Sequence, residues 1–488
     1  MANNFVEMRL ESPDFSCDKV QIHRVLGTER ISQLFSFDIE VVTLDPPVIA
    51  QKKVLGARAS LVVVRDDFEV RRFHGMIVER SHELDDQIEH ETFRLRLAPR
   101  AHRLSLVETQ ELFLEKSVPE IIEQKLQQVG FTGEDYELRL LSTYPQREIV
   151  VQYKESDLAF ISRLCEHLGI SYFFEHDATR DKIVFTDVQA SFPAIPSAPL
   201  RPRGDRRDVF MLARQEKVIP AVYVMRDYNY RTPSVDLTGE HELPEAYAGG
   251  VVENGAHVKT PEESEALAKI RGEERQVESL VYTGQSDLPL FSAGRLFPLE
   301  SSIPAEFSNV KPDSPETTLL LVEVTHEASF SVLIAGGEGD ERHYKNTFRA
   351  IPEEHPYRPP RITPRPRIHG FITGIVDPGP GEPAGRIAQL DTWGRYMVRF
   401  LFDTAEHEGK KSHPIRMIQP HGGANYGMHF PLKPGVEVLL GFVDGDPDRP
   451  LIVGAVYRPD TPSPVTSAEP TMNRLKSESG VIIEIHDA

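Results

Sequence analysis

Apolar and polar residues alternate along the beginning of the chain. In the segment FSFDIEV (residues 35–41) every second residue is apolar, and similar strand-like segments follow at residues 59–64, 72–78 and 93–97. Because successive side chains of a strand point to opposite faces, each segment predicts a strand with one face in a core. Together they predict an antiparallel barrel or sandwich.

Helix signals replace this alternation in the middle of the chain. Residues 117–120 (SVPE) combine an N-cap serine, a proline in the first turn and a capping-box glutamate, and apolar residues then recur at helical spacing. A second helix is predicted over residues 156–169, and a third runs from the capping box TPEE over residues 260–278. A strand at residues 170–174 follows the second helix, so this region mixes α and β structure.

The last third of the chain reads as β structure behind a linker. The segment HPYRPPRITPRPRIHG (residues 355–370) is dense in proline, which forbids a helix and favours extended polyproline II, so we expect a domain boundary there. Short strands punctuated by glycine fill residues 371–457, as in a small barrel such as an OB-fold. In the final strand Val481, Ile483 and Ile485 form an apolar face that a lone terminal strand cannot bury. We therefore expect this strand to pair with other copies of the chain.

Charge and cysteine content narrow the possible partners and compartments. The chain holds 75 acidic and 55 basic residues, a net charge of −20 that repels phosphate backbones and anionic membranes. Two cysteines, Cys17 and Cys165, do not make a disulfide framework and indicate folding in a reducing compartment. The N-terminus lacks the basic and apolar regions of a signal peptide, and no apolar run approaches the ~18 residues of a membrane span. Any export is expected to need no signal peptide.

Familiar catalytic and metal-binding patterns fail on inspection. The acidic turn DGDPD (residues 444–448) lacks the glycine and later ligands of a calcium loop, so we interpret it as a tight hairpin turn. A set of histidines lacks any zinc spacing: His407, His413, His421 and His429. Paired carboxylates for glycoside hydrolysis are defined by their separation in space, so the sequence leaves that class open. We assign no catalytic residue, cofactor or metal, and expect a protein that is not an enzyme.

One long segment carries a family resemblance. VQYKESDLAFISRLCEHLGISYFFEH (residues 151–176) resembles the hallmark segment of the VgrG family, the trimeric spike proteins of type VI secretion. Similar blocks flank it in the expected order: GTERISQLFSFDIEV (27–41), RRFHGMIVE (71–79), FRLRLAPRAHRLSL (93–106), YKNTFRAIPEEHPYRPPR (344–361), DTWGRYMVRFLFD (391–403) and MIQPHGGANYGMHFPLKPGVEVLLGFVDGDPDRPLIVGAVY (417–457). The resemblance therefore covers nearly the whole chain. One departure is Tyr426, which stands where the family commonly carries Trp.

The resemblance implies a mainly β fold with an α+β insert: two tube-like β-barrels in a hub, an OB-fold, and the start of a trimeric β-prism. The domains that it implies are a first hub barrel (1–110), an α+β insert (111–199), the first part of the second hub barrel (200–240), the second part of the insert (241–299), the second part of the second barrel (300–350), a Pro-rich linker (351–370), the OB-fold (371–465) and the start of the needle (466–488). The chain ends where the family's valine-glycine repeats would begin, and we expect a short or truncated spike with no appended effector domain.

The resemblance also implies an assembly. Three chains with two similar barrels each present six similar surfaces to a six-fold tube. The implied partners are two further copies of the chain, a hexameric tube protein of the Hcp type above, baseplate proteins, effectors or adaptors, and a PAAR-like tip protein below if the needle is complete; nucleic acid is not among them. Such a protein would be assembled in the bacterial cytoplasm and exported without a signal peptide into the target cell or the medium.

The residues that we expect to carry function are assembly determinants. They are Trp393, Gly394 and Arg395 at a barrel turn; Gly427 and Met428 in the adjoining segment; Gly445, Asp446, Asp448 and Arg449 in a hairpin; and Val481, Ile483 and Ile485 in the last strand. Three other functions stay open. The same fold could serve as the hub-spike of a contractile phage tail or extracellular injection particle, the chain could be an envelope-degrading enzyme, or its OB-fold could bind nucleic acid, where we expect no binding.

Overall fold

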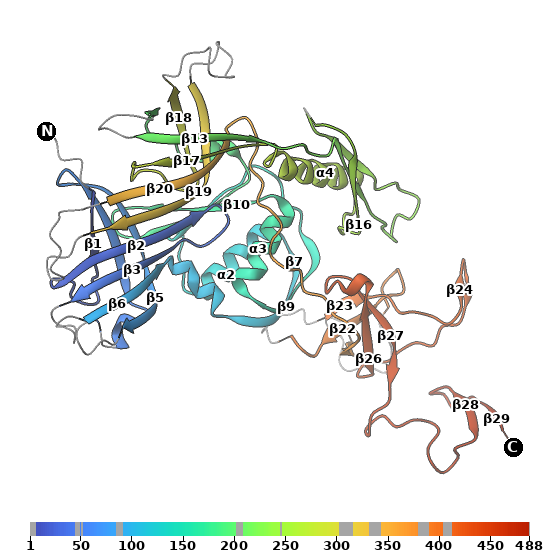
Figure 1. The fold of residues 1–488 in the computed structure, drawn as a ribbon. Helices are drawn as coiled ribbons and strands as arrows, with labels where there is room; N and C mark the ends of the chain where they lie inside the picture. The colour runs from blue at the N-terminus through green and yellow to red at the C-terminus, as the bar shows by residue number, and fades with distance from the viewer. Residues whose placement is uncertain are drawn as a thin grey trace. The chain divides into compact units, whose positions relative to one another are not determined.

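The chain divides into two compact units. The structure, a computed structural model, describes residues 6–43, 49, 52–83, 91–201, 208–244, 246–301, 316–330, 343–378, 390–403 and 412–487. The first unit comprises Met1–Val107, Ile122–Thr143 and Asp157–Pro364, and the second comprises Glu108–Ile121, Tyr144–Ser156 and Arg365–Ala488. Figure 1 shows the elements of both units, each of which is described by itself below.

A twelve-stranded sheet forms the frame of the first unit. Its strands are, in spatial order, β1 (Val6–Glu11), β4 (Arg58–Arg65), β5 (Phe68–Glu83), β6 (Glu91–Ala98), β3 (Ser36–Thr43), β2 (Val20–Arg30), β19 (Glu316–Ser329), β18 (Arg295–Ser301), β12 (Ala198–Leu200), β13 (Val209–Glu216), β17 (Leu280–Ser286) and β20 (His343–Pro352). Strand β20 also pairs with β19, so the second half of this order closes into a ring. Strand β2 pairs with β19 and joins the two halves into one sheet. This order confirms the expected hub of two β-barrel modules.

Burial along the strands follows the sequence pattern. Strand β3 alternates between half-buried and fully buried positions, and Phe37, Ile39 and Val41 are wholly inside. Strand β19 instead carries a continuous buried run, residues 319–322. Leu319 and Leu321 belong to the core inside the second ring, whereas alternate residues of the run face a different core. A strand that is buried on both faces needs a continuous apolar run, and this is the reason for the sequence TTLLLVE.

Each of the three predicted helices is present with the expected bounds. They are α2 (Val118–Gln128), α3 (Asp157–Leu168) and α4 (Pro261–Gln276). The predicted caps are also formed: the Glu120 carboxylate accepts from the Ser117 backbone N–H at 2.7 Å, and the Thr260 hydroxyl accepts from the Glu263 N–H at 3.3 Å. Short 3-10 turns lie at η1 (Lys52–Val54), η2 (Arg100–Ser105), η3 (Gln189–Ser191) and η5 (Val443–Gly445).

Two small sheets accompany the helices in the first unit. One consists of β8 (Tyr136–Arg139), β11 (Asp181–Thr186) and β10 (Ser171–His176), the predicted strand after α3; the other consists of β15 (Gly239–Glu242), β14 (Val222–Arg226) and β16 (Gly250–Asn254). Helix α4 packs on this second sheet around Tyr223, Met225 and Leu267.

The strand order redraws the boundaries expected for the second barrel. Strand β17 lies within the range 241–299 expected for the insert and β18 begins in it, yet both belong to the second ring. Strands β14 and β15 begin within the range 200–240 expected for the barrel but lie in the sheet beside α4. Pairing between distant strands decides membership of a barrel, and the local pattern of each strand does not encode its partner.

The second unit is built around a five-stranded sheet. Its order is β23 (Ser412–Ile415), β22 (Tyr396–Phe400), β21 (Ile372–Val376), β26 (Glu437–Phe442) and β27 (Pro450–Val456). A ribbon of β7 (Glu108–Lys116) and β9 (Arg147–Ser156) adds Leu112, Ile149 and Val151 to the core of this sheet. Neither ribbon strand is among those that the sequence pattern predicts. Two hairpins complete the unit: β24 (Gly422–Gly423) with β25 (Tyr426–Gly427), and β28 (Met472–Lys476) with β29 (Ile482–His486).

Candidate assembly site

The predicted turn around Trp393 is rigid and presents an indole ring to solvent. The Asp391 carboxylate accepts hydrogen bonds from the backbone N–H groups of Trp393 and Arg395 at 2.9 and 2.8 Å, and from the Arg395 guanidinium at 2.6 Å. Burial raises the pKa of Asp391, but these donors outweigh burial and lower it below its usual value. Gly394 has φ of +71°, a conformation that glycine adopts without strain. The turn therefore fixes the backbone at Trp393, whose side chain is 58% exposed.

The hairpin of β24 and β25 places the next two predicted residues. Gly427 has φ of +144°, and a Cβ there would lie 2.5 Å from the carbonyl oxygen of His421. Only glycine fits this close approach, which lets the Met428 N–H donate to the same oxygen at 2.9 Å. The side chains of Tyr426 and Met428 are exposed beside Phe430. The exposed side chains of the hairpin region are thus mainly apolar.

The acidic turn at residues 445–449, interpreted above as a tight hairpin turn, has its residues 446–448 buried. Asp446 accepts from the Arg365 guanidinium at 2.8 Å and from the backbone N–H of Asp448 at 3.1 Å. Asp448 accepts from the backbone N–H of Val151, on strand β9, at 2.7 Å. Both carboxylates are almost fully buried. Asp448 therefore fastens this turn of the five-stranded sheet to the β7–β9 ribbon, whereas Asp446 shapes the turn and binds Arg365. The Arg449 N–H closes the same turn by donating to the Asp446 carbonyl oxygen.

The last strand pairs within its own chain, because β29 pairs with β28. The expected contact with other copies of the chain stays a prediction. The turn between them is stabilised because the Val481 N–H donates to the Ser477 hydroxyl at 3.0 Å, and a short loop costs little closure entropy. The apolar face is nevertheless left uncovered within the chain, with Val481, Ile483 and Ile485 65%, 59% and 62% exposed.

These predicted residues all belong to the second unit, but each group makes its own local contacts. They share a structural character, because glycines and buried carboxylates shape turns from which apolar side chains project. Within the described ranges no three His, Cys, Asp or Glu side chains are grouped for metal binding, and no helix is long and apolar enough to cross a membrane. His407 lies outside the described residues.

Sequence reasoning missed a buried ionic cluster in the first unit. Glu29 of β2 accepts two hydrogen bonds from Arg71 of β5 at 3.0 and 3.1 Å, one from Ser292 at 2.6 Å, and one from His326 of β19 at 2.8 Å. Burial raises the pKa of Glu29, but the charge of Arg71 and the His326 hydrogen bond outweigh burial and lower it to about 2. The Arg71 guanidinium also donates to the carbonyl of Phe291 at 2.5 Å. One carboxylate thus links strands of both barrel modules.

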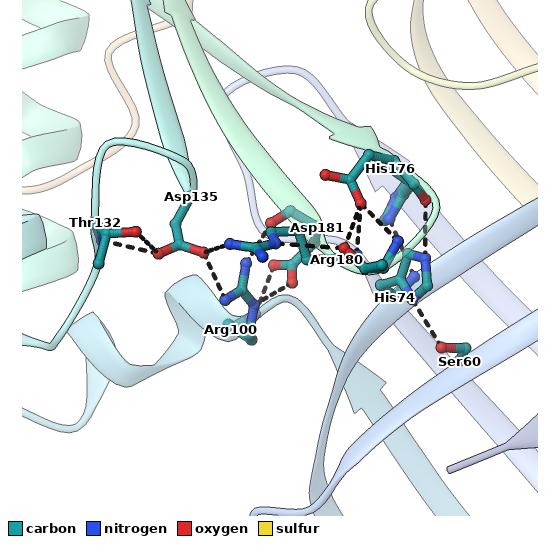
Figure 2. Close-up of polar contacts among 10 residues, drawn as sticks. Ser60, His74, Arg100, Thr132, Asp135, His176, Arg180 and Asp181 are labelled. Carbon is teal, nitrogen blue, oxygen red and sulfur yellow. Dashed lines mark hydrogen bonds and ion pairs between the residues drawn. The ribbon is translucent and has the colours of Figure 1, made fainter. Parts of the chain in front are cut away.

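A second missed cluster joins η2 to the small sheet of β8, β10 and β11. Figure 2 shows Arg100 between two carboxylates: it donates to Asp135 at 2.8 Å and to Asp181 at 2.5 Å. The backbone and hydroxyl of Thr132 each donate to Asp135 at 2.8 Å. Burial raises the pKa of Asp135, but these donors lower it to about 2. Arg180 lies 3.6 Å from the same carboxylate.

Two histidines, His74 and His176, lie beside this cluster and connect it to the first barrel (Figure 2). The Nε2 of His74 lies 3.0 Å from the carbonyl oxygen of Asp177, so Nε2 carries the proton and Nδ1 accepts from the Ser60 hydroxyl at 2.8 Å. The backbone N–H of His74 donates to His176 at 3.1 Å. Burial, followed by the charge of Arg71, lowers the pKa of His176 to about 3. These imidazoles are therefore neutral connectors at neutral pH.

A sequence signal for these clusters does exist. Glu29, Arg71, His74 and Arg100 all lie within the segments that carry the family resemblance, although none was singled out there. Charged residues inside such segments resemble the polar face of a strand, and only the fold shows that they are buried.

Comparisons with known proteins agree with this architecture. The family described as "Phage tail baseplate hub (GPD)" matches residues 28–331, and the family described as "Type VI secretion system/phage-baseplate injector OB domain" matches residues 384–457. The second match confirms the predicted OB-fold.

Individual relatives extend the comparison. The chain is 32% identical over 476 residues to the type VI secretion system spike protein VgrG5 of Pseudomonas aeruginosa, which covers 91% of this chain and 56% of VgrG5. It is 27% identical to the actin cross-linking toxin VgrG1 of Vibrio cholerae, over 91% of this chain and 40% of the toxin. The chain thus spans about half the length of these curated relatives. Among solved structures, the E. coli c3393 protein, a type VI secretion component with structural similarity to T4 phage tail proteins gp27 and gp5, aligns with a TM-score of 0.66 and 24% identity over 92% of this chain and 100% of that chain.

Proposed function

Since the chain belongs to the phage tail baseplate hub (GPD) family and is related to the VgrG spike proteins, we propose that it is the structural hub and spike base of a type VI secretion system. In this role it caps the secreted tube and is driven with it through a target envelope, carrying effectors. Its action depends on shape and self-association, and it forms and breaks no covalent bond.

The observation that carries this proposal is the single sheet in which two barrel modules are joined through β2 and β19. A chain with two similar barrels offers two similar surfaces, so a trimer offers six to a six-fold tube. This supports three copies of the chain as the working unit and a hexameric tube protein of the Hcp type as the partner above. Baseplate proteins, and a PAAR-like tip protein below a complete needle, follow from the same assembly.

The apolar surface of the second unit supports self-association. The exposed residues of β29 and of the β24–β25 hairpin place several large apolar side chains in solvent when the chain is alone. Exposed apolar surface of this kind marks protein contacts in soluble proteins. We assign these residues to contacts between copies of the chain.

The mass in solution tests the proposal directly. Light scattering on the full chain at about 1 and about 10 µM is expected to give a trimer of the 55.1 kDa chain. The double variant Ile483→Asp/Ile485→Asp is expected to weaken the trimer, because it places charges on the uncovered face. Leu141→Asp is the matched control, since Leu141 is an exposed apolar residue of the first unit. A folded monomer at both concentrations would contradict the assembly.

The alternatives differ in their readouts. The same hub in a contractile phage tail or extracellular injection particle would be encoded beside tail genes rather than secretion genes. An envelope-degrading enzyme would release products from purified peptidoglycan, and activity lost on substitution of one glutamate would favour it. An OB-fold that binds nucleic acid would show salt-sensitive binding to oligonucleotides, and the acidic charge of the chain predicts none.

A further inference from the structure

The proline-rich segment at residues 357–363 is tied to the first unit by side chains rather than by regular structure. Residues 353–371 form neither helix nor strand. The segment nevertheless runs past α3, α4 and β16, and its polar side chains bind acidic residues of all three elements. Its outer side faces solvent, where Ile362 is 59% exposed. Tyr357 packs against a core cluster of the hub and Pro359 is buried, whereas residues 360–362 are exposed, so polar contacts rather than apolar burial hold the later part of the segment.

Two arginines of the segment provide its ionic anchors. Arg358 pairs with Glu273 of α4 at 2.7 Å and donates to the carbonyl oxygens of Gly169 and Asp187 at 3.1 and 3.0 Å. A Cβ on Gly169 would lie 3.0 Å from the Arg358 side chain, so the glycine at the end of α3 makes room for this anchor. The Arg358 and Glu273 side chains are both largely buried.

Arg361 makes the second anchor through a charged network. Its guanidinium pairs with Glu274 of α4 at 3.1 Å and with Glu253 of β16 at 2.9 Å, and donates to the Tyr223 hydroxyl at 3.3 Å. The Tyr223 hydroxyl donates in turn to Glu253 at 2.5 Å. Charge-assisted bonds of this kind are stronger than neutral ones, yet the side chain of Arg361 is 30% exposed and its ion pairs are open to screening by salt.

Thr363 satisfies a carboxylate that is buried in the hub. The N–H and hydroxyl of Thr363 donate to Glu166 of α3 at 3.0 and 2.6 Å. Glu166 is only 4% exposed. Burial raises the pKa of Glu166, and the donors from Thr363 and Ile362 offset only part of that effect. The segment thus supplies the hydrogen bonds that this buried carboxylate needs.

An open pocket of about 210 Å³ lies between part of the segment and the hub, and its walls include Arg30, Glu166, Glu274, Tyr357 and Ile362. The segment is therefore not packed against the hub along its whole length.

We propose that residues 357–363 form an ionic strap, a segment that opens and closes on the hub and is held shut by Arg358, Arg361 and Thr363. Opening the strap exposes the faces of α3 and α4 that it covers and precedes unfolding of either helix. Rising salt favours opening, because the ion pairs of Arg361 are partly exposed. This inference concerns the hub alone and holds whichever particle the protein belongs to.

Opening of the strap can be measured by trypsin cleavage after one of its own arginines. Trypsin does not cleave Arg-Pro bonds, so Arg358–Pro359 is resistant, whereas Arg361–Ile362 is cleavable once the Arg361 side chain leaves its carboxylates. Limited trypsin digestion of the full chain, read by mass spectrometry, measures cleavage at this bond. Each rate is divided by that of a free peptide of residues 357–365 in the same buffer. When opening is faster than cleavage, this ratio tracks the open population.

Charge removal should open the strap. Glu274→Gln is expected to raise the normalised cleavage rate about tenfold, since it removes one charge-assisted partner of Arg361. Glu265→Gln, at an exposed position of the same helix, is the matched control and is expected to match wild type. In wild type, a change from 0.1 to 1 M NaCl shortens the screening length from about 10 to about 3 Å and should raise cleavage several-fold.

A conservative variant tests the strap even if Glu274→Gln does not fold. Arg361→Lys keeps the positive charge and a trypsin site but loses the forked contacts, and should be cut faster than wild type relative to the matching lysine peptide. If Glu274→Gln melts the whole chain in circular dichroism, Arg361→Lys decides the matter. Normalised cleavage that is equal in wild type and Arg361→Lys, or that does not rise with salt, would overturn the strap.

Discussion

Replacing Glu29 by glutamine should weaken the hub far more than any exposed charge change. The Glu29 side chain is 6% exposed and binds Arg71, Ser292 and His326 together. Glutamine keeps the shape but removes the charge, and it leaves the Arg71 guanidinium, 11% exposed, without its buried counterion. Removal of one partner from a buried ion pair costs about 3–5 kcal/mol.

The pKa of Glu29 gives a second route to this magnitude. It is about 2 in the folded chain against the ordinary value of 4.5 for a glutamate. At about 1.36 kcal/mol for each pKa unit, the folded environment contributes about 3 kcal/mol to stability at neutral pH. Because the folded pKa is the lower one, this contribution is present above pH 4.5 and is lost as the pH falls toward 2. Burial lowers the pKa of His326, so protonation of the unfolded chain below about pH 6.5 destabilises the hub in the same direction.

Hydrogen exchange read by mass spectrometry is the suitable assay, because a chain of this size does not unfold in two states. Peptides from β2 and β19 of the Glu29→Gln variant should lose about a hundredfold in protection at pH 7. Between pH 4.5 and 3, wild type should lose protection while the variant changes little.

An exposed carboxylate on β19, next to His326, provides the control. Glu327 of β19 pairs with Lys345 at 2.9 Å on the surface, and Glu327→Gln should cost less than about 1 kcal/mol. Equal loss of protection in Glu29→Gln and Glu327→Gln would refute the reasoning from burial.

Three further substitutions test separate parts of the fold. Lys125→Met breaks the pair with Asp157, in which the Nζ and a carboxylate oxygen lie 3.0 Å apart and both side chains are 1% exposed. A loss of about 3–5 kcal/mol should appear as lost hydrogen-exchange protection in α2 and α3, and a loss below about 1 kcal/mol would contradict the stated strength of the pair. Asp448→Ala removes the acceptor of the Val151 N–H and should cost about 1–3 kcal/mol, seen as faster exchange of the β7–β9 ribbon; unchanged exchange would contradict the proposed fastening. Thr260→Ala removes the cap of α4 and should cost about 1 kcal/mol, read from exchange in its first turn, whereas Thr260→Ser should behave as wild type.

Local patterns in the sequence determined the elements and their burial. The caps at Ser117 and Thr260 predicted where α2 and α4 begin, because a cap satisfies backbone groups within its own turn. Alternation predicted β3, and the continuous run of β19 follows from two cores on its two faces. The uncovered apolar face of residues 481–485 was also readable, because facing within a strand is a local property.

Long-range pairing was decided only by the tertiary structure. Residues 24–30 of β2 pair with residues 323–329 of β19, and no local pattern specifies a partner so distant in the chain. The same holds for β7 and β9, which complete a core built mainly from residues beyond 370. Strand β29 pairs with β28, because a neighbouring segment of the same chain is always present at high effective concentration.

The residues of the candidate site also fall into two groups, those that a local pattern predicts and those whose burial only the tertiary structure decides. Gly394 was expected at a turn and has the positive φ that a turn glycine adopts, whereas Gly427, expected only in the adjoining segment, also has a positive φ. The burial of Asp446 and Asp448, and of Glu29 and its partners, could not be read, since a carboxylate on a strand or turn has the same sequence pattern in solvent and in a core. The alternation of a strand and the cap of a helix depend on residues that are close in the sequence. The position of a buried charge depends instead on which distant cation the fold brings to it.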